Sequence, residues 1–197
     1  MRSNRLTPIL AAVFCGIASP VLAHTEVGVP GGLLSGALHP LTGADHLVAM
    51  VAVGLWGAQL GRPAIWILPI AFPVVMAFGA VLGMAGTPVP QPELMIALSA
   101  LVLGLLVAFA VRANLWAAAL VVSVFAIFHG YAHGQELPEA ANPLAYGLGF
   151  VVATGTLHAI GIGIGTLTRW EAGRRAVQGL GLGVAGLGVF FLASVLR

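Results

Sequence analysis

Two histidines one helical turn apart begin a short run of ionisable residues in the second half of the chain. His129 and His133 are four positions apart, and Glu136 follows three positions later. On a helix, residues spaced by three or four positions share one face, so both imidazoles and the carboxylate can approach one ion. The spacing therefore predicts a site for a metal ion on this segment.

A second cluster, nearer the N-terminus, contains His39, Asp45 and His46. Along an unbroken helix His39 and His46 would lie about 10.5 Å apart, which is too far for both to bind one ion. Pro40 and Gly43 lie between them and disfavour an unbroken helix, so we expect a bend that returns His39 toward the other two. Asp45 can bind the ion itself, or hold the imidazole of His46 in one tautomer.

Imidazole and carboxylate without thiolate form a borderline ligand set that suits Ni(II), Co(II), Zn(II) or Cu(II). The alternative is that these groups only form hydrogen bonds between helices or lie among lipid headgroups. Because six such polar groups gather in two short segments of a chain with only 6 acidic residues, we favour a metal site. Its predicted members are His39, Asp45, His46, His129, His133 and Glu136.

The composition of this 197-residue chain excludes a soluble enzyme. Apolar residues make up 59% of the chain and charged residues 7%, whereas soluble domains are about 25% charged. The long continuous apolar runs predict membrane-spanning helices rather than a barrel. The isoelectric point near 9.3 does not indicate a nucleic-acid partner, because the 8 basic residues are scattered arginines that form no stripe.

Residues 1–23 have the pattern of a signal peptide. Two arginines precede an apolar stretch, and the segment ends Val21-Leu22-Ala23, with the small residues that signal peptidase accepts. We expect cleavage before His24, and an uncleaved first helix is the alternative. The single cysteine, Cys15, lies inside this segment, so residues 24–197 offer a metal no thiolate ligand.

Six apolar segments of about 20 residues then predict a six-span membrane domain over residues 24–197. The first begins between residues 33 and 44 and ends at 60, and the others cover 64–84, 93–111, 115–133, 144–167 and 176–196. We therefore expect an all-α integral membrane protein of six transmembrane helices after a cleaved signal peptide. Close helix packing is expected at three pairs of small residues, Gly32/Gly36, Gly161/Gly165 and Gly179/Gly183.

The arginines are distributed asymmetrically among the links between these spans. A mature chain that starts outside the cytoplasm places the first, third and fifth links inside, and those links hold Arg62, Arg112, Arg169, Arg174 and Arg175. The outward segments hold Glu26, Glu93, Glu136, Glu139 and, as their one arginine, Arg197. The positive-inside rule thus predicts a bacterial inner-membrane protein whose mature termini and two ionisable clusters are all periplasmic.

Three further residues each have two interpretations. His158 lies about 21 Å into the fifth predicted span, and it is either a packing residue or a relay ligand on the inward path. Met50, one turn from His46, is either a soft ligand or a packing residue. His24 either chelates a metal together with the mature N-terminal amine or belongs to an ordinary chain terminus.

The two clusters resemble elements of the HupE/UreJ family of hydrogenase and urease accessory membrane proteins. His39-Pro40 with Asp45-His46 is similar to the HPxxGxDH element of that family, and residues 128–136 are similar to its FHGxAHGxE element. The resemblance extends over essentially the whole chain. It implies uptake of nickel, or of cobalt, for nickel enzymes, with the histidines and acidic residues of both elements needed for transport.

We therefore expect an ATP-independent permease, not an enzyme, that admits Ni(II), or Co(II), from the periplasm into the cytoplasm. The sequence has no nucleotide-binding loop, and the membrane potential supplies about 4.6 kcal/mol for a divalent ion at 100 mV. The ion is the transported substrate, and no prosthetic group is expected. The expected partners are the metal ion and the bilayer, without nucleic acid or nucleotide, and assembly into a homo-oligomer stays open.

Two alternatives belong to other classes of protein. One is a membrane metalloenzyme in which His129, His133 and an acid hold a catalytic zinc ion. The residues between these histidines are Gly-Tyr-Ala, without the glutamate of the zinc hydrolase motif, which disfavours it. The other is a haem protein with two axial histidines, such as His46 and His133, which a visible absorption spectrum would reveal.

Overall fold

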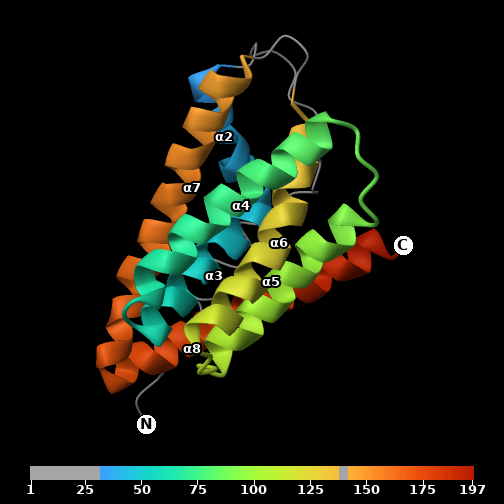
Figure 1. Cartoon of the computed structure of the whole chain (residues 1–197). Coiled ribbons are helices and arrows are strands. Elements are labelled where there is room, and N and C mark those ends of the chain that lie inside the picture. Colours follow the sequence, from blue (N-terminus) through green and yellow to red (C-terminus); the bar gives the residue numbers. More distant parts are fainter. Residues whose placement is uncertain (1–31, 138–141) are drawn as a thin grey trace.

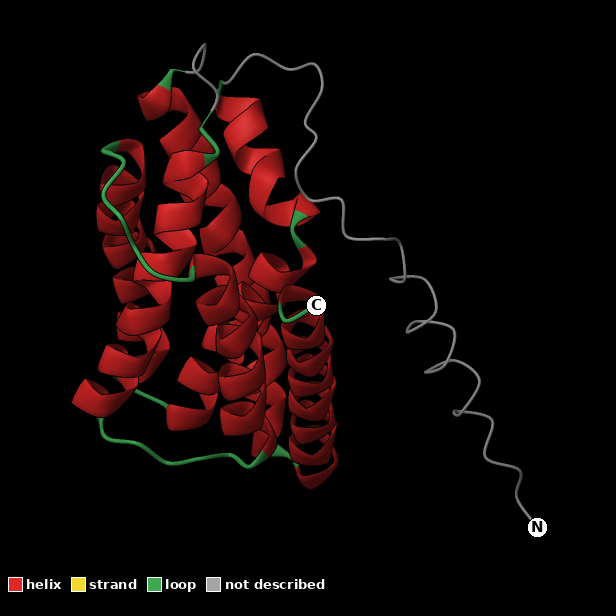
Figure 2. Ribbon diagram, turned by 90° about the vertical axis from the view of Figure 1, so that its right-hand side faces the viewer, coloured by secondary structure: helices red, strands yellow, loops and turns green. Residues whose placement is uncertain are grey.

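Every regular element in the part of the chain that the structure describes is a helix (Figures 1 and 2). The structure is a computed structural model and describes residues 32–137 and 142–197. The prediction of an all-α fold is confirmed for these residues. The helices are α2 (Leu33–Thr42), α3 (Ala44–Leu60), α4 (Ala64–Met84), α5 (Pro92–Ala108), α6 (Leu115–Gln135), α7 (Pro143–Gly165), the short 3-10 helix η1 (Thr166–Arg169) and α8 (Glu171–Val195).

Four of these helices, among the described residues, are long and apolar enough to cross a membrane: α4, α6, α8, and α7 together with η1. The helices α2 and α3 form a fifth span if the bent pair is counted as one, and α5 is a shorter apolar helix of 17 residues. The structure thus supports a protein with several membrane-spanning helices. The count of six stays a prediction, and the predicted signal peptide lies outside the described residues.

The end of α5 differs from its predicted boundary for a local reason. Ala110 adopts a left-handed backbone conformation with φ of 47°. The N–H of Ala110 donates to the carbonyl of Val107, and the N–H of Val111 donates to the carbonyl of Leu106. These two bonds satisfy the last carbonyls of the helix and end it at Ala108, before the predicted residue 111.

The helices pack in close pairs, most extensively α4 with α6, α5 with α8, and α7 with both α2 and α3. Glycines make this proximity possible, as expected for helices in lipid. A Cβ atom at Gly36 would overlap the carbonyl of Tyr146 across the α2–α7 contact, and one at Gly161 would overlap that of Val51 across the α3–α7 contact. The predicted small-residue contacts at Gly36 and Gly161 are therefore confirmed.

On α8 the predicted contact at Gly179 was wrong. A Cβ atom at Gly179 would meet nothing within 4 Å, whereas Gly181 and Gly188 lie directly against the backbone of α5 at Ala108 and Leu101. Spacing by four residues identifies a glycine stripe but not the side of the helix that faces a neighbour. The rotation of α8 about its axis, set by its packing on α5, decides which glycines make the contact.

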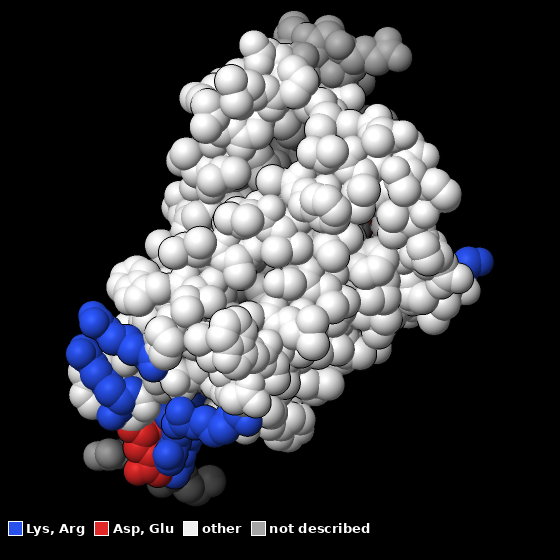
Figure 3. All heavy atoms as spheres, in the orientation of Figure 1, with Lys and Arg blue, Asp and Glu red and all other residues white. Residues whose placement is uncertain are grey.

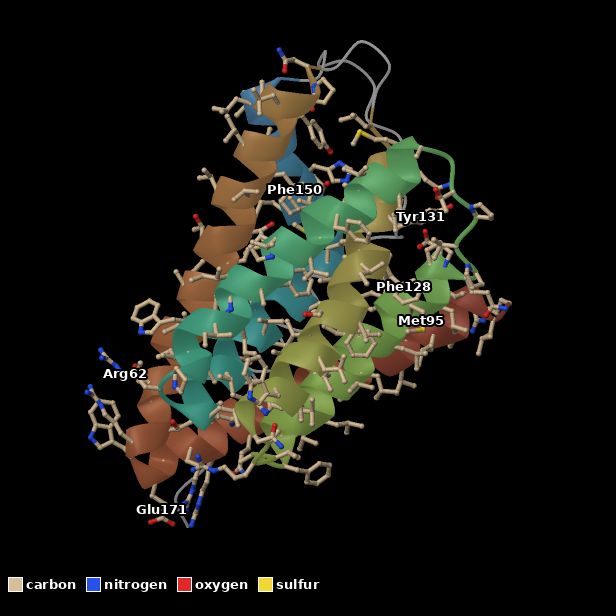
Figure 4. The ribbon with its side chains drawn as sticks, in the orientation of Figure 1. Arg62, Met95, Phe128, Tyr131, Phe150 and Glu171 are labelled. Atoms are coloured by element: carbon tan, nitrogen blue, oxygen red, sulfur yellow. The ribbon has the colours of Figure 1, made fainter. Side chains whose placement is uncertain are left out.

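The two ends of the bundle differ in charge. Figure 3 shows that, on the visible face, most basic side chains gather at one end beside acidic ones, while another basic group lies apart from them. Glu171 lies at this end (Figure 4). Arg62, at the turn between α3 and α4, belongs to this end (Figure 4). We call it the arginine end, and we call the opposite end, where α6 ends and α7 begins, the histidine end. Between them the surface exposes many large apolar side chains, which suits a lipid environment.

Candidate metal site

A sharp break between α2 and α3 forms one wall of the candidate site. The two helices meet at an angle of 87°. Gly43 joins them in an extended conformation, and Pro40 lies inside α2 without ending it. The predicted bend is therefore present, and it occurs at Gly43. It places His39 on one helix and Asp45 with His46 at the start of the next.

Asp45 holds His46 rather than pointing away from it. One carboxylate oxygen, Oδ1, accepts from the backbone N–H of His46 at 2.8 Å and lies 2.9 Å from its Nδ1. Because the carboxylate accepts a hydrogen bond from Nδ1–H, the other ring nitrogen carries the lone pair that a metal needs. That nitrogen, Nε2, is buried and has no hydrogen-bond partner. The geometry matches the alternative in which Asp45 orients the imidazole.

His129 is oriented in a similar way by a residue that sequence reasoning did not select. The hydroxyl of Ser99 on α5 lies 2.8 Å from His129 Nε2 and donates to the carbonyl of Ile96 at 2.6 Å. Because the hydroxyl donates its hydrogen bond to the carbonyl of Ile96, it accepts a hydrogen bond from Nε2–H of His129. The lone pair of this imidazole is then on Nδ1. Nδ1 of His129 is buried without a hydrogen-bond partner. A serine in an apolar helix gives no signal of this contact, which depends on α5 lying beside α6.

The two sequence clusters come together at the histidine end. His39 Nε2 lies 3.2 Å from Glu136 Oε2, and His133 Nδ1 lies 3.8 Å from the same oxygen. Each of these three residues offers a ligand atom, and the three atoms lie within 4.8 Å of one another. Two ligands on opposite sides of an ion at about 2.1 Å are about 4.2 Å apart, so small side-chain rotations suffice to bind it.

The four histidines of the two clusters form a continuous series of ring contacts. The ring of His133 lies 4.8 Å from that of His39 and 4.3 Å from that of His46, centroid to centroid. His46 in turn lies 4.6 Å from His129. All six predicted site residues therefore occupy one region, which we call the histidine cluster: His39, Asp45, His46, His129, His133 and Glu136.

A polar cavity of about 20 Å³ opens into this cluster and is large enough for one ion or water molecule. It is lined by His39, Asp45, His46, His133 and Glu136, and also by Glu93 at the start of α5. Glu93 was predicted only as an acidic residue on the outward side, so its place beside the cluster was missed. A larger cavity of about 190 Å³ also reaches His133, but its lining is mainly apolar.

The other residues with two interpretations lie elsewhere. Met50 is fully buried among apolar side chains of the core, which supports the packing interpretation. His158 is buried on α7 outside the histidine cluster, and its ring contacts that of Phe72 at 5.5 Å. His24 lies outside the described residues.

In Figure 4, Phe150, whose ring contacts His133 at 4.4 Å, lies far from Arg62 and Glu171 at the arginine end.

Comparison with known proteins identifies the family of the chain. The model of the HupE / UreJ protein family matches residues 12–191. The chain belongs to the HupE / UreJ family. It is also 45% identical over 195 residues to Protein HupE of Rhizobium leguminosarum bv. viciae, an alignment that covers 98% of this chain and 100% of that protein. No solved structure matches the chain.

Membership in the HupE / UreJ family agrees with the resemblance carried by the two clusters. The matched range includes both clusters and all the described helices except the last residues of α8. The histidine cluster is thus contained within the part of the chain that the family shares.

Proposed function

We propose that this HupE / UreJ protein is a secondary permease that takes up Ni(II), or Co(II), across the bacterial inner membrane for the maturation of nickel enzymes. The observation that carries the proposal is the convergence of His39 on α2 with His133 and Glu136, which lie at the end of α6 and directly after it. Imidazole nitrogens and carboxylate oxygens form a borderline ligand set suited to these ions. Family membership supports the same proposal.

The charges of the cluster suit capture of a divalent cation. Asp45 and Glu136 lie within it, and Glu93 lines the same cavity, so carboxylates lie around the imidazoles. Glu136 is the more exposed partner of His39, with 29% of its side chain accessible against 14%. A cation that arrives from outside therefore meets carboxylate first and imidazole behind it. Such a gradient favours entry without requiring a permanently bound ion.

The geometry favours neither alternative class of protein. A haem would need room for its macrocycle between two axial histidines, but the rings of His46 and His133 are in contact and the polar cavity holds about 20 Å³. A hydrolytic zinc site would need a carboxylate base beside an open coordination position. The sequence also lacks the glutamate that zinc hydrolases place between two such histidines, since residues 130–132 are Gly-Tyr-Ala.

Uptake by proteoliposomes tests the proposal directly. Purified protein is reconstituted, a membrane potential negative inside is imposed, and the initial uptake of Ni(II), Co(II), Zn(II) and Cu(II) is compared with that of protein-free liposomes. We expect uptake of Ni(II) or Co(II) that depends on the potential. Uptake of both ions equal to that of protein-free liposomes would refute the proposed function.

A further inference from the structure

His158 is a buried polar group that the histidine cluster does not use. Its side chain is 1% exposed, and neither ring nitrogen has a hydrogen-bond partner. A neutral imidazole carries one donor and one acceptor, and leaving both unpaired in a protein interior is unfavourable. His158 lies eight residues beyond Phe150 on α7, about 12 Å further from the histidine end.

A backbone carbonyl of α4 without its usual helical partner lies near this histidine. Pro73 lies four residues after Pro69 in α4 and has no N–H, so the carbonyl of Pro69 lacks its usual helical partner. Pro69 lies three residues before Phe72, whose ring contacts that of His158, so this carbonyl belongs to the part of α4 that packs beside the imidazole. One turn away on the same face of α7, the hydroxyl of Thr154 is also buried without a partner. Neutral oxygen and nitrogen groups therefore gather in an otherwise apolar part of the bundle.

One aromatic ring joins this region to the histidine cluster. The ring of Phe72 on α4 lies 5.5 Å from that of His129 and 5.5 Å from that of His158. Phe72 is fully buried. The series of ring contacts thus runs from His39 at the histidine end through the cluster to Phe72 and then to His158. Phe72 is the one member of this series that has no metal-binding atom.

We propose that His158 and the carbonyl of Pro69 form a second, inner position for the transported divalent ion, separated from the histidine cluster by the ring of Phe72. This inference rests on the proposed function. The four acidic residues in the described ranges are Asp45, Glu93 and Glu136, which border the outer cavity, and Glu171, which lies at the arginine end (Figure 4). An ion beside His158 would therefore be held by neutral ligands alone, which makes the position transient and suits transfer rather than storage.

Substitutions of His158 test whether this residue binds the ion or only packs against its neighbours. We expect His158→Asn to lower the initial rate of Ni(II) uptake by 10-fold or more while changing equilibrium Ni(II) binding at the outer cluster by less than 2-fold. We expect His158→Cys to raise the ratio of Cd(II) to Ni(II) uptake by at least 10-fold, because thiolate favours softer ions. The matched control is Ile160→Cys, on the exposed face of the same helix.

The ratio measured with His158→Cys keeps the test decisive even if His158→Asn folds poorly. If His158 only packs, the ratio of Cd(II) to Ni(II) uptake should be unchanged in His158→Cys. Uptake by a folded His158→Asn variant should then be unchanged as well. An unchanged ratio would overturn the inner position. If the wild-type protein takes up no metal, the proposed function fails, and Cd(II) binding to His158→Cys in detergent then decides the inner position separately. A thiolate-to-metal charge-transfer band absent from Ile160→Cys would support it, and the lack of such a band would overturn it.

Discussion

The two ends of the bundle are both built from apolar helices, but they differ in how those helices are arranged. At the histidine end, α2 and α3 separate at an angle of 87°, and the break admits carboxylates and imidazoles around a small cavity. Toward the arginine end, α3 and α7 lie so close that a Cβ atom at Gly54 would overlap the carbonyl of His158. Close backbone contact also occurs at the histidine end, where Gly36 lies against Tyr146. The histidine end therefore differs in its helix break and in the polar cavity beside that break.

Polar groups at the arginine end complete the helix ends instead of forming a site. The indole N–H of Trp56 donates to the carbonyl of Val111, and the amide of Gln59 donates to that of Val107, both at 3.0 Å. The guanidinium of Arg112 donates to the carbonyl of Gln59. The carbonyl of Gln59 is one that the end of α3 leaves without a helical partner, whereas that of Val107 also accepts from the N–H of Ala110. Oε1 of Gln59 is nevertheless buried without a partner, so an unpaired lone pair alone does not mark a site. The histidine end differs because its unpaired imidazole nitrogens lie together with two carboxylates.

The first prediction concerns the orientation of the two ends in the membrane. A reporter measures it with an all-or-none outcome. The arginine asymmetry predicts that the histidine end faces the periplasm and that the C-terminus is periplasmic. A reporter active only in the cytoplasm should therefore be silent when fused after Arg197 and active when inserted beside Arg62. Activity at the C-terminus would contradict the six-span topology.

Loss of the central imidazole should have the largest effect on metal binding. His133 contacts His39 and His46 and lies near Glu136, so His133→Ala removes a ligand and the contacts that align two others. We expect Ni(II) affinity, measured by titration calorimetry, to fall by more than about 100-fold, beyond the losses typical of supporting residues. Tyr131→Phe, at a buried position of the same helix, is the control. Similar affinities in both variants would refute a shared site.

Loss of the Glu136 carboxylate should have the next largest effect, because one of its oxygens lies near the imidazoles of both His39 and His133. Glu136→Gln keeps the shape of the side chain but removes the charge, and we expect Ni(II) uptake to fall by about 10- to 100-fold. Glu171→Gln is the matched control, since Glu171 is 66% exposed at the arginine end and pairs with Arg175. Equal uptake by the two variants would show that the charge of the histidine end has no part in capture.

Ser99 should have a smaller effect, through the orientation of His129. Removal of the hydroxyl in Ser99→Ala frees the imidazole to change its tautomer, and we expect Ni(II) affinity to fall by up to about 10-fold. Ser99→Thr keeps a hydroxyl and should restore part of the affinity if the larger side chain fits. An affinity for Ser99→Ala within experimental error of the wild-type value would mean that His129 needs no such partner.

Changes in the α3–α7 contact should lower the stability of the protein and have little direct effect on its affinity for metal. Gly161→Ala places a methyl group against the carbonyl of Val51, so we expect the free energy of unfolding in detergent to fall by about 1–3 kcal/mol. Gly163→Ala is the control, because a Cβ atom there meets nothing within 4 Å. Equal thermal stability of the two variants would refute the tight α3–α7 contact.

Local signals in the sequence were sufficient for part of this structure. The boundaries of α4 follow from an apolar run between Pro63 and Ala85, and the shared face of His129 and His133 follows from helical periodicity alone. The family elements are contiguous, so they too could be read without a fold. These features depend on residues that are near one another in the chain.

Tertiary structure decided the features that depend on which helices are neighbours and how each is rotated. The sequence indicated a bend near Pro40 and Gly43, but not that it would bring His39 to Glu136, 97 residues away. It gave no reason to place Ser99 beside His129, or Phe72 between two histidine rings. Composition and periodicity set what each helix can bury, whereas the approach of whole helices, permitted by glycine, sets which buried groups meet.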